Sequence, residues 1–316
     1  MKPEILVIKQ MAPAETMAAL EESFECHHLW RVPAAEREKF VSEVAQGVRG
    51  VATTGGDGIS RNLMERLPNL EIVAVYGVGV DAVDLDAARE LGVEVSNTPD
   101  VLTEDVADLA VTLLLAASRS LCRLDGHVRS GDWEEGVPLA MPRSVRGKTA
   151  GILGLGRIGR AVASRLSAFG MNVRYYQPRP KEDAPVPRVE SLLELARMSD
   201  YLVVCAPARP ETLRVVDASV LEALGSSGVL VNIARGSLVD ESALIDALRD
   251  GRLGGAALDV FADEPHVPEE LRKLENVILT PHIGSFTFET RQAMGRLVVE
   301  NLKAHFEGRG LVTPVD

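Results

Sequence analysis

Three side chains stand near the ends of three apolar, strand-like runs. Together they could bind a 2-oxo acid and protonate its carbonyl oxygen during reduction. Arg235, Glu264 and His282 each follow such a run by two to four residues. The runs are VLVNI (229–233), AALDV (256–260) and VILT (277–280). In open α/β folds the carboxyl ends of parallel strands meet at one edge of the sheet, and ligands bind there. The sequence therefore predicts that the three side chains converge on one site.

Each of the three residue types suits one part of that reaction. Arg235 can hold a substrate carboxylate with two hydrogen bonds and polarise the neighbouring carbonyl. His282 can give a proton to the carbonyl oxygen as a hydride reaches the carbon. Glu264 can bind the other ring nitrogen, orient the ring and favour its protonated form. We therefore expect all three to be catalytic, and Arg235 to bind substrate as well.

The other histidines are weaker candidates. His266 lies two residues from Glu264 and is the rival to His282, although its proline-rich setting favours a loop residue. The remaining histidines are expected to be surface or packing residues (His27 and His28) or solvated helix residues (His127 and His305).

A glycine-rich turn with the spacing GxGxxG occupies 154–159 and directly follows the strand-like run TAGIL (149–153). Gly154 allows the tight turn, Gly156 lets a diphosphate approach the backbone, and Gly159 lets the next helix pack on the strand. The diphosphate would lie at the helix N-terminus, where free N–H groups and the helix dipole favour an anion. The alternative is a glycine turn without a ligand.

The side chain that would read the ribose follows the next strand, about twenty residues further on. An NAD-specific site usually has Asp or Glu there, but this chain has Gln177, followed by Arg179 and Lys181. Gln177 would not repel a 2′-phosphate, and the two cations could pair with it. We therefore expect NADP(H) to be favoured over NAD(H). A solvated loop with incidental cations is the alternative.

A second glycine-containing turn, YGVGVD (76–81), follows the strand-like run IVAVY (72–76). Its exposed N–H groups could hold a carboxylate. From the residues alone, an ordinary turn between a strand and a helix fits equally well.

Strand-like and helix-like runs alternate along the chain, which is typical of parallel sheets with helices on both faces. The first array of strand-like runs lies at 5–8, 24–30, 51–54, 72–76 and 93–96. The second lies at 149–153, 172–176, 201–205, 229–233, 256–260 and 277–280, a spacing typical of dinucleotide-binding folds. We therefore expect an α/β fold with two doubly wound parallel-sheet domains, one Rossmann and one flavodoxin-like.

Two long helical patterns complete the prediction. One helix is expected from 103 to 129 with Thr103 as its N-cap, and another from 287 to 307 that returns to the first domain. The nucleotide-binding domain (100–285), with an arm at 119–147, would then be inserted into a substrate domain made of 1–99 plus 286–316.

Charge and composition exclude several classes of partner. The 316 residues carry 34 Lys and Arg against 46 Asp and Glu, a net charge of −12, which repels nucleic acid and anionic lipid. The three cysteines are far apart without a CxxC pair, so we expect free thiols in a reducing cytoplasm and no metal site. The N-terminus is typical of a strand, not a signal peptide. The apolar stretch 109–118 is too short to span a bilayer.

Taken together, these motifs resemble the D-isomer-specific 2-hydroxyacid dehydrogenase family over nearly the whole chain. The run NTPDVLTEDVADLA and the C-terminal segment ETRQAMGRLVVENLKAHFEGRGLVTPV are most similar to its glyoxylate/hydroxypyruvate and hydroxyphenylpyruvate reductase branch. The other matching stretches are YGVGVDAVDLDAARELGVEVS, GILGLGRIGRAVASRL, LVNIARGSLVDESAL, GGAALDVFADEP and LTPHIGS.

The resemblance implies roles for the residues at matching positions. Arg235, Glu264 and His282 fall on the family's catalytic positions, and Val78, Gly79 and Ser285 on substrate-binding ones. The set expected to bind the cofactor is Thr103, Gly154, Leu155, Gly156, Arg157, Ile158, Gly159, Gln177, Arg179, Cys205, Ala206, Pro207, Thr212, Ile233, Ala234, Asp259, His282 and Gly284.

The arm at 119–147 matches the segment that builds the family's homodimer. Within it, Trp133 matches a residue that in some members reaches the partner's active site, although a tryptophan packed within the arm fits equally well. Two departures stand out: Gln177 and Pro178 replace a Ser-Arg pair common among NADPH-using relatives, and Phe286 replaces a small residue.

The resemblance implies a cytoplasmic, homodimeric NAD(P)H-dependent reductase of small 2-oxo acids, with glyoxylate and hydroxypyruvate as the leading substrates, bound between the two domains. Two alternatives remain. One is a dehydrogenase for phosphoglycerate or an aromatic pyruvate. The other is a nucleotide-sensing corepressor, a binding protein that shares the fold.

Overall fold

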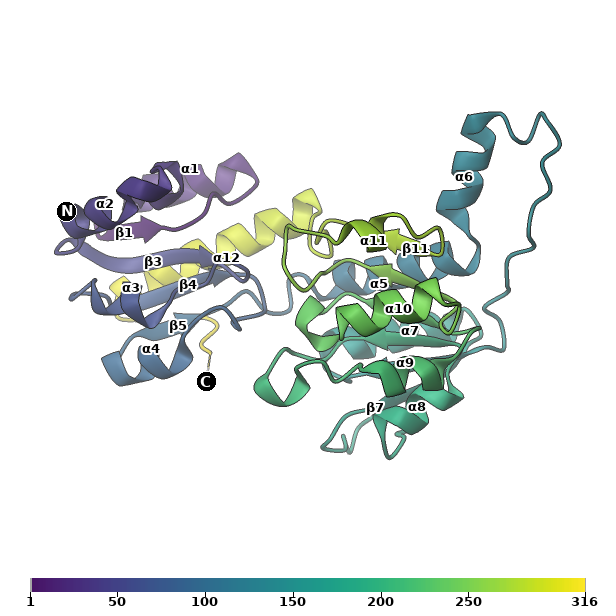
Figure 1. The fold of residues 1–316 in the computed structure, drawn as a ribbon. Helices are drawn as coiled ribbons and strands as arrows, with labels where there is room; N and C mark the ends of the chain where they lie inside the picture. Colours follow the sequence, from purple (N-terminus) through teal and green to yellow (C-terminus); the bar gives the residue numbers. More distant parts are fainter. Residues whose placement is uncertain (1, 316) are drawn as a thin grey trace. The chain divides into compact units, whose positions relative to one another are not determined.

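The computed structural model describes residues 2–315, which divide into two compact units (Figure 1). Unit 1 comprises Met1–Leu102 and Phe286–Asp316, and unit 2 comprises Thr103–Ser285. The division into two independent domains, one made of 1–99 plus 286–316 and the other of 100–285, stays a prediction.

Unit 1 contains a five-stranded parallel sheet in the order β2-β1-β3-β4-β5, the flavodoxin-like order. Its interior strands are almost entirely buried, as expected of a parallel sheet with both faces covered. The strands are β1 (Glu4–Val7), β2 (Glu25–His28), β3 (Val48–Thr54), β4 (Ile72–Tyr76) and β5 (Glu94–Ser96).

The C-terminal helix α12 belongs to unit 1, where it contacts α1 and β4 (Figure 1). It is the helix predicted at 287–307. Its N-cap is Thr287, whose hydroxyl oxygen accepts a hydrogen bond from Thr290 N. The helices of unit 1 are α1 (Ala14–Ser23), α2 (Arg37–Val44), α3 (Arg61–Glu65), α4 (Leu85–Leu91) and α12 (Phe288–Phe306), with short 3₁₀ turns η1 (Leu29–Arg31) and η2 (Ala34–Glu36).

Unit 2 contains a six-stranded parallel sheet in the order β11-β10-β9-β8-β6-β7. A parallel bridge between Tyr175 and Arg188 extends it beyond β7. When the bridged segment is counted as the strand beyond β7, the strands follow the order of the Rossmann fold. This order confirms the predicted fold class. The strands are β6 (Thr149–Leu153), β7 (Asn172–Tyr176), β8 (Tyr201–Val204), β9 (Val229–Asn232), β10 (Gly255–Leu258) and β11 (Val277–Leu279).

The third strand is reduced to a bridge because prolines precede it. Pro185 and Pro187 lack a backbone N–H, so this segment cannot form a continuous ladder. Two hydrogen bonds remain, from Tyr175 N to Pro187 O (3.0 Å) and from Val189 N to Tyr175 O (2.8 Å).

The prediction of a single helix over 103–129 is wrong, because the structure has two helices there. Ser120 adopts a left-handed φ of 50° and interrupts the helix. The carbonyl oxygen of Ser118 accepts from Arg143 N (3.1 Å), and the Ser118 hydroxyl donates to Arg143 O (2.8 Å), so the returning arm binds the end of the first helix. Thr103, predicted to be the N-cap, is the first helical residue.

The helices of unit 2 cover both faces of its sheet (Figure 1). They are α5 (Thr103–Ser118), α6 (Leu121–Ser130), α7 (Arg157–Ala168), α8 (Leu192–Met198), α9 (Ala218–Leu224), α10 (Glu241–Arg249) and α11 (Glu269–Arg272), with 3₁₀ turns η3 (Pro210–Thr212) and η4 (Gly236–Leu238). Within residues 2–315, no helix combines the length and apolar character needed to cross a membrane.

Candidate active site

His282 and Glu264 form a hydrogen-bonded pair beyond the carboxyl ends of β10 and β11. The Nδ1 atom of His282 lies 2.7 Å from Oε2 of Glu264. The other carboxylate oxygen of Glu264 accepts from Phe261 N (3.0 Å). Burial raises the pKa of Glu264, but the hydrogen bonds from His282 and Phe261 outweigh it and hold this pKa below its usual range. Glu264 is therefore an ionised carboxylate near neutral pH.

Arg235 lies in the turn after β9, and its positive charge also lowers the pKa of Glu264. Asn232 shapes this turn, because its side chain accepts from Ala234 N (3.1 Å) and donates to Arg235 O (2.9 Å). The half-buried Arg235 side chain donates to Ala234 O (2.8 Å). The structure thus brings Arg235 into the electrostatic field of the His282–Glu264 pair.

Asp259 positions the backbone around His282, a role that the sequence did not reveal. The Asp259 carboxylate is 1% exposed and accepts hydrogen bonds from Ile283 N (2.8 Å), Gly284 N (2.9 Å) and the Thr280 hydroxyl (2.7 Å). Asp259 O accepts from His282 N (2.9 Å). Burial raises the pKa of Asp259, and these donors oppose that rise. His282 is held at the strained φ of 54° by this network.

The remaining histidines do not compete for this site. His266 is exposed, and its backbone N–H donates to Asp263 O (2.7 Å) within its own loop. The expectation that His127 and His305 are solvated is wrong, since their side chains are 11% and 15% exposed. His305 lies between two carboxylates contributed by other elements, Glu71 and Glu94.

The glycine-rich turn joins β6 to α7 and lies against the end of β8. Gly154 has a φ of 93°, and an added Cβ would lie 2.8 Å from Ala206 Cα. A Cβ at Gly159 would lie 2.1 Å from Gly154 O, so helix and turn approach closely. This is the topological switch point of the sheet, where open α/β folds bind ligands.

The N-terminus of α7 fits a diphosphate. Its N-cap, Gly156, is exposed and provides no side-chain hydrogen bond to the first turn. A Cβ added at Gly156 would have no heavy atom within 4 Å, so open space adjoins the N–H donors. Other helices satisfy such donors with N-cap side chains: Ser60 in α3, Asp84 in α4, Ser191 in α8, Asp217 in α9, Asp240 in α10 and Thr287 in α12.

Gln177 ties the glycine-rich turn to the loop after β7. Its side chain accepts from Leu155 N (3.0 Å) and donates to Arg179 O (2.6 Å). Arg179 and Lys181 are exposed, and within residues 2–315 neither forms an ion pair with a carboxylate. These cations therefore remain available to an anionic ligand at this loop.

The other predicted cofactor residues also lie in unit 2. Thr212 shapes the loop after β8, because its hydroxyl donates to Pro207 O (2.9 Å) and accepts from Arg209 N (2.8 Å). Burial raises the pKa of the Cys205 thiol, which therefore stays protonated. The remaining residues predicted to bind the cofactor lie just after a strand of unit 2 or in the first turn of α5 or α7. They are Thr103, Arg157, Ile158, Ala206, Ile233, Ala234 and Gly284.

The turn after β4 in unit 1 exposes unpaired backbone donors. Asn97 Nδ2 donates to Val78 O (2.9 Å), and the Thr98 hydroxyl oxygen accepts from Gly77 N (3.0 Å). Among the described residues, the N–H groups of Val78 and Gly79 have no acceptor. Two neighbouring N–H groups without an acceptor favour an anion, so carboxylate binding by this turn stays a prediction.

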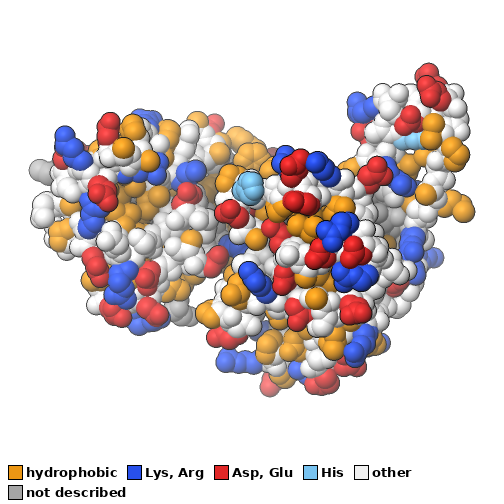
Figure 2. All heavy atoms as spheres, in the orientation of Figure 1, with side chains coloured by type: hydrophobic (Ala, Val, Ile, Leu, Met, Phe, Trp, Pro, Cys, Tyr) orange, Lys and Arg blue, Asp and Glu red, His pale blue; other side chains and the backbone are white. Residues whose placement is uncertain are grey.

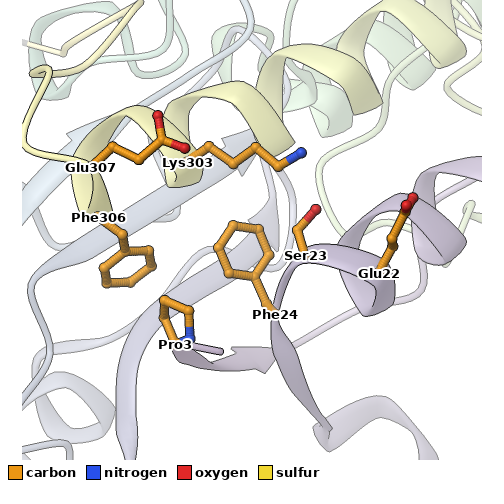
Figure 3. Close-up of a pocket in the computed structure, with 7 residues that line it drawn as sticks. All are labelled: Pro3, Glu22, Ser23, Phe24, Lys303, Phe306 and Glu307. Atoms are coloured by element: carbon orange, nitrogen blue, oxygen red, sulfur yellow. The ribbon is translucent and has the colours of Figure 1, made fainter. Parts of the chain in front are cut away.

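Two further predicted substrate residues, Ser285 and Trp133, lie in unit 2. Ser285 is half-buried at the end of unit 2, and Trp133 is 67% exposed on the arm. In unit 1, a cavity of about 440 Å³ lies between the ends of α1 and α12 (Figure 3), where Phe24 and Phe306 line it together with charged side chains. It contains none of the predicted site residues.

The comparisons with known proteins agree with this geometry. Residues 111–284 match the family model described as "D-isomer specific 2-hydroxyacid dehydrogenase, NAD binding domain". This nicotinamide-binding domain spans most of unit 2.

Two curated relatives cover nearly the whole chain. The chain is 50% identical over 296 residues to glyoxylate/hydroxypyruvate reductase A of Arabidopsis thaliana, covering 94% of each protein. It is 46% identical to hydroxyphenylpyruvate reductase of Plectranthus scutellarioides, covering 99% of each. Among solved structures, NADPH-dependent glyoxylate/hydroxypyruvate reductase of Sinorhizobium meliloti, in complex with NADP and malonate, has a TM-score of 0.90 and 43% identity, covering 100% of this chain and 97% of that one.

Proposed function

Because the chain belongs to the D-isomer-specific 2-hydroxyacid dehydrogenase family, whose members are oxidoreductases, we propose that it uses NADPH to reduce glyoxylate and hydroxypyruvate to D-2-hydroxy acids. The observation that carries this proposal is the 2.7 Å contact between His282 and Glu264 beside the charge of Arg235. A proton donor, an ionised carboxylate and a fixed cation are the protein groups that reduction of a 2-oxo acid requires.

In this reaction, bound NADPH supplies a hydride to the carbonyl carbon. The Arg235 guanidinium holds the substrate carboxylate and polarises the carbonyl. His282 gives the proton on Nε2 to the carbonyl oxygen, while Glu264 accepts the hydrogen bond from Nδ1 and stabilises the protonated ring. The free N–H groups of Val78 and Gly79 bind the substrate carboxylate, and Ser285 contacts the substrate.

The preference for NADPH over NADH rests on the loop after β7. Gln177 brings no negative charge that would repel a 2′-phosphate, and its side chain holds the Gly154–Gly159 turn instead. The exposed Arg179 and Lys181 can pair with the phosphate. The diphosphate would lie at the N-terminus of α7, against the N–H groups beside Gly156.

The arm supports a homodimer. Both α6 and the segment after it extend from the sheet of unit 2 (Figure 1), and apolar side chains gather there (Figure 2). These side chains are 42–94% exposed, and such a patch marks an interface. We expect a second copy of this chain to cover it and Trp133 to reach the partner's site. The patch comprises Leu121, Val128, Trp133, Val137, Leu139 and Met141.

The compartment proposed is the cytoplasm. Cys26, Cys122 and Cys205 are all free thiols in the structure, in keeping with a reducing environment.

Oxidation of NADPH, followed at 340 nm against a panel of 2-oxo acids, tests the proposal. We expect turnover with glyoxylate and hydroxypyruvate, and a fall in kcat of about 10²- to 10⁴-fold in His282→Ala with NADPH binding retained. His266→Ala is the matched control, since His266 is exposed and bonded only within its own loop. Absence of turnover with every 2-oxo acid, or near-normal turnover in His282→Ala, contradicts the proposal.

A further inference from the structure

The C-terminal segment 311–315 lies beside β5, the last strand in the sheet order of unit 1 (Figure 1). Ser96 and Pro314 form an antiparallel bridge, and Val315 N donates a hydrogen bond to Val95 O (2.8 Å). The segment therefore covers part of a sheet edge that would otherwise expose unpaired backbone groups.

A buried amide in α12 fastens this segment. The Asn301 side chain is fully buried, and its Oδ1 atom accepts hydrogen bonds from Val312 N and Thr313 N (both 3.0 Å). Its Nδ2 atom donates to Leu297 O (2.8 Å) and to the Thr313 hydroxyl oxygen (2.9 Å). The amide thus makes two bonds as acceptor and two as donor, which is its full capacity. Because a buried polar group is costly to leave unpaired, the segment is held to α12 at Thr313.

Thr313 passes this constraint to the loop after β5. Its hydroxyl donates to Asn97 O (2.6 Å), and Thr313 O accepts from Asn97 N (3.3 Å). Both backbone polar groups of Asn97 are therefore bound by one residue. The Asn97 side chain in turn donates from Nδ2 to Val78 O (2.9 Å). A continuous chain of hydrogen bonds thus runs from Asn301 through Thr313 and Asn97 to the turn after β4.

The bond to Val78 O determines where a donor of this turn points. The carbonyl of Val78 and the N–H of Gly79 belong to one peptide unit, and a peptide unit is planar. Holding the oxygen therefore also fixes the direction of the Gly79 N–H, which has no acceptor among the described residues. Gly77 and Gly79 lack a Cβ, so the backbone on both sides of Val78 resists rotation less than other residues would.

We propose that Asn97 and Thr313 are positioning residues for the substrate, because they orient the peptide unit whose N–H binds the substrate carboxylate. The inference rests on the proposed function, in which Val78 and Gly79 bind that carboxylate. The carboxylate does not react, so its bond to the turn has similar strength in the bound substrate and in the transition state. Loss of this positioning should therefore raise KM and leave kcat unchanged.

The test measures KM and kcat for glyoxylate in the full-length enzyme with saturating NADPH. Asn97→Ala should raise KM by about three- to tenfold, the range of one hydrogen bond, at constant kcat. Thr313→Val removes the hydroxyl and should raise KM by about twofold or more, whereas Thr313→Ser retains the hydroxyl and should keep the wild-type KM. The double variant of Asn97→Ala and Thr313→Val should resemble Asn97→Ala, because Thr313 acts only through Asn97.

Asn69→Ala is the matched control. The Asn69 amide also donates to a backbone carbonyl, Gln46 O (2.9 Å), but Asn69 precedes β4 and so lies at the other end of this strand from the turn. Its KM should equal that of the wild type. Urea denaturation checks that each variant is folded, and Thr313→Val keeps the test decisive if Asn97→Ala is not.

An unchanged KM in the folded variants, or a fall in kcat at constant KM, contradicts the inference. So does a double variant in which the two effects multiply in full. In each case turnover of glyoxylate by the wild type leaves the proposed function intact. A wild-type enzyme inactive with every 2-oxo acid overturns the proposed function itself.

Discussion

His282 and Glu264 are joined at 2.7 Å through the histidine's Nδ1 atom, which leaves Nε2 to face a substrate. Burial raises the pKa of Glu264, but the hydrogen bonds from His282 and Phe261 N hold it below its usual range, so an ionised carboxylate faces the ring. The pair is therefore suited to give a proton to a carbonyl oxygen during reduction and to take one from an alcohol in the reverse direction.

Glu264→Gln should lower kcat for reduction by about tenfold or more, because the ring loses its orienting partner. Steady-state kinetics with glyoxylate measure this loss, and an unchanged kcat contradicts the role of Glu264.

Gly156 and Gly159 offer a matched pair of variants in one turn. A Cβ at Gly156 meets open space, so Gly156→Ala should fold normally but weaken NADPH binding, since the methyl group occupies the space next to the diphosphate. A Cβ at Gly159 would lie 2.1 Å from Gly154 O, so Gly159→Ala should destabilise the fold by about 1–3 kcal/mol. Urea unfolding of the apoprotein and fluorescence titration with NADPH separate these outcomes.

The result would contradict this interpretation if Gly156→Ala bound NADPH as tightly as the wild type. Normal stability of Gly159→Ala would show that the turn can relax away from the helix.

Where a strand end determines position, the sequence predicted which side chains lie near one another. Arg235, Glu264 and His282 could be placed together because parallel strands deliver their carboxyl ends to one edge. The role of Asp259 in holding the His282 loop was not predictable, because its hydrogen bonds go to backbone N–H groups whose positions depend on the strained φ at His282. Nothing in the residue pattern signals that conformation.

Errors arose where tertiary contacts override local pattern. The helical periodicity continues through Ser120, but Arg143 binds the end of α5 from 25 residues away along the chain. His305 lies in a helical pattern typical of solvated residues, yet strands of the same unit bring Glu71 and Glu94 to both of its ring nitrogens. Such pairings depend on sheet order, which periodicity does not encode.

The choice between cofactors should depend on Arg179 and Lys181. Replacing both with Gln should lower kcat/KM for NADPH by about tenfold or more, since charge-assisted bonds to the 2′-phosphate are lost. The kcat/KM for NADH should change much less, because NADH lacks that phosphate. Lys273→Gln, which removes a cation paired with Glu269 on α11, is the control. Equal losses with both cofactors would show that the loop does not read the phosphate.

The apolar patch on the arm should hold two copies of the chain together. Leu139 and Met141 are 52% and 94% exposed, so replacing both with Glu places charge in the proposed interface. Sedimentation equilibrium should give twice the chain mass of 34.0 kDa for the wild type and 34.0 kDa for the variant. Phe169→Glu changes an exposed aromatic residue outside the arm and should stay dimeric. A monomeric wild type contradicts the proposal.

Glu71 should contribute to stability in a pH-dependent way. Hydrogen bonds from Arg49 hold its pKa below the usual range, burial opposes this, and His305 supports it. The folded state thus binds fewer protons here than the unfolded state, so the contribution is present above the unfolded pKa and is lost as pH falls through the folded pKa. Both partners of the Arg49–Glu71 pair are partly in water, so the contribution is at most about 1 kcal/mol.

Glu71→Gln should therefore have a lower free energy of unfolding than the wild type at pH 7. This difference in free energy should disappear as pH falls below about 4.5. Urea denaturation curves at a series of pH values measure it. Glu182→Gln, an exposed carboxylate in the loop after β7, should show no such dependence. A difference between Glu71→Gln and the wild type that persists unchanged at acid pH would show that packing of the side chain, not its charge, supports α12 against the sheet.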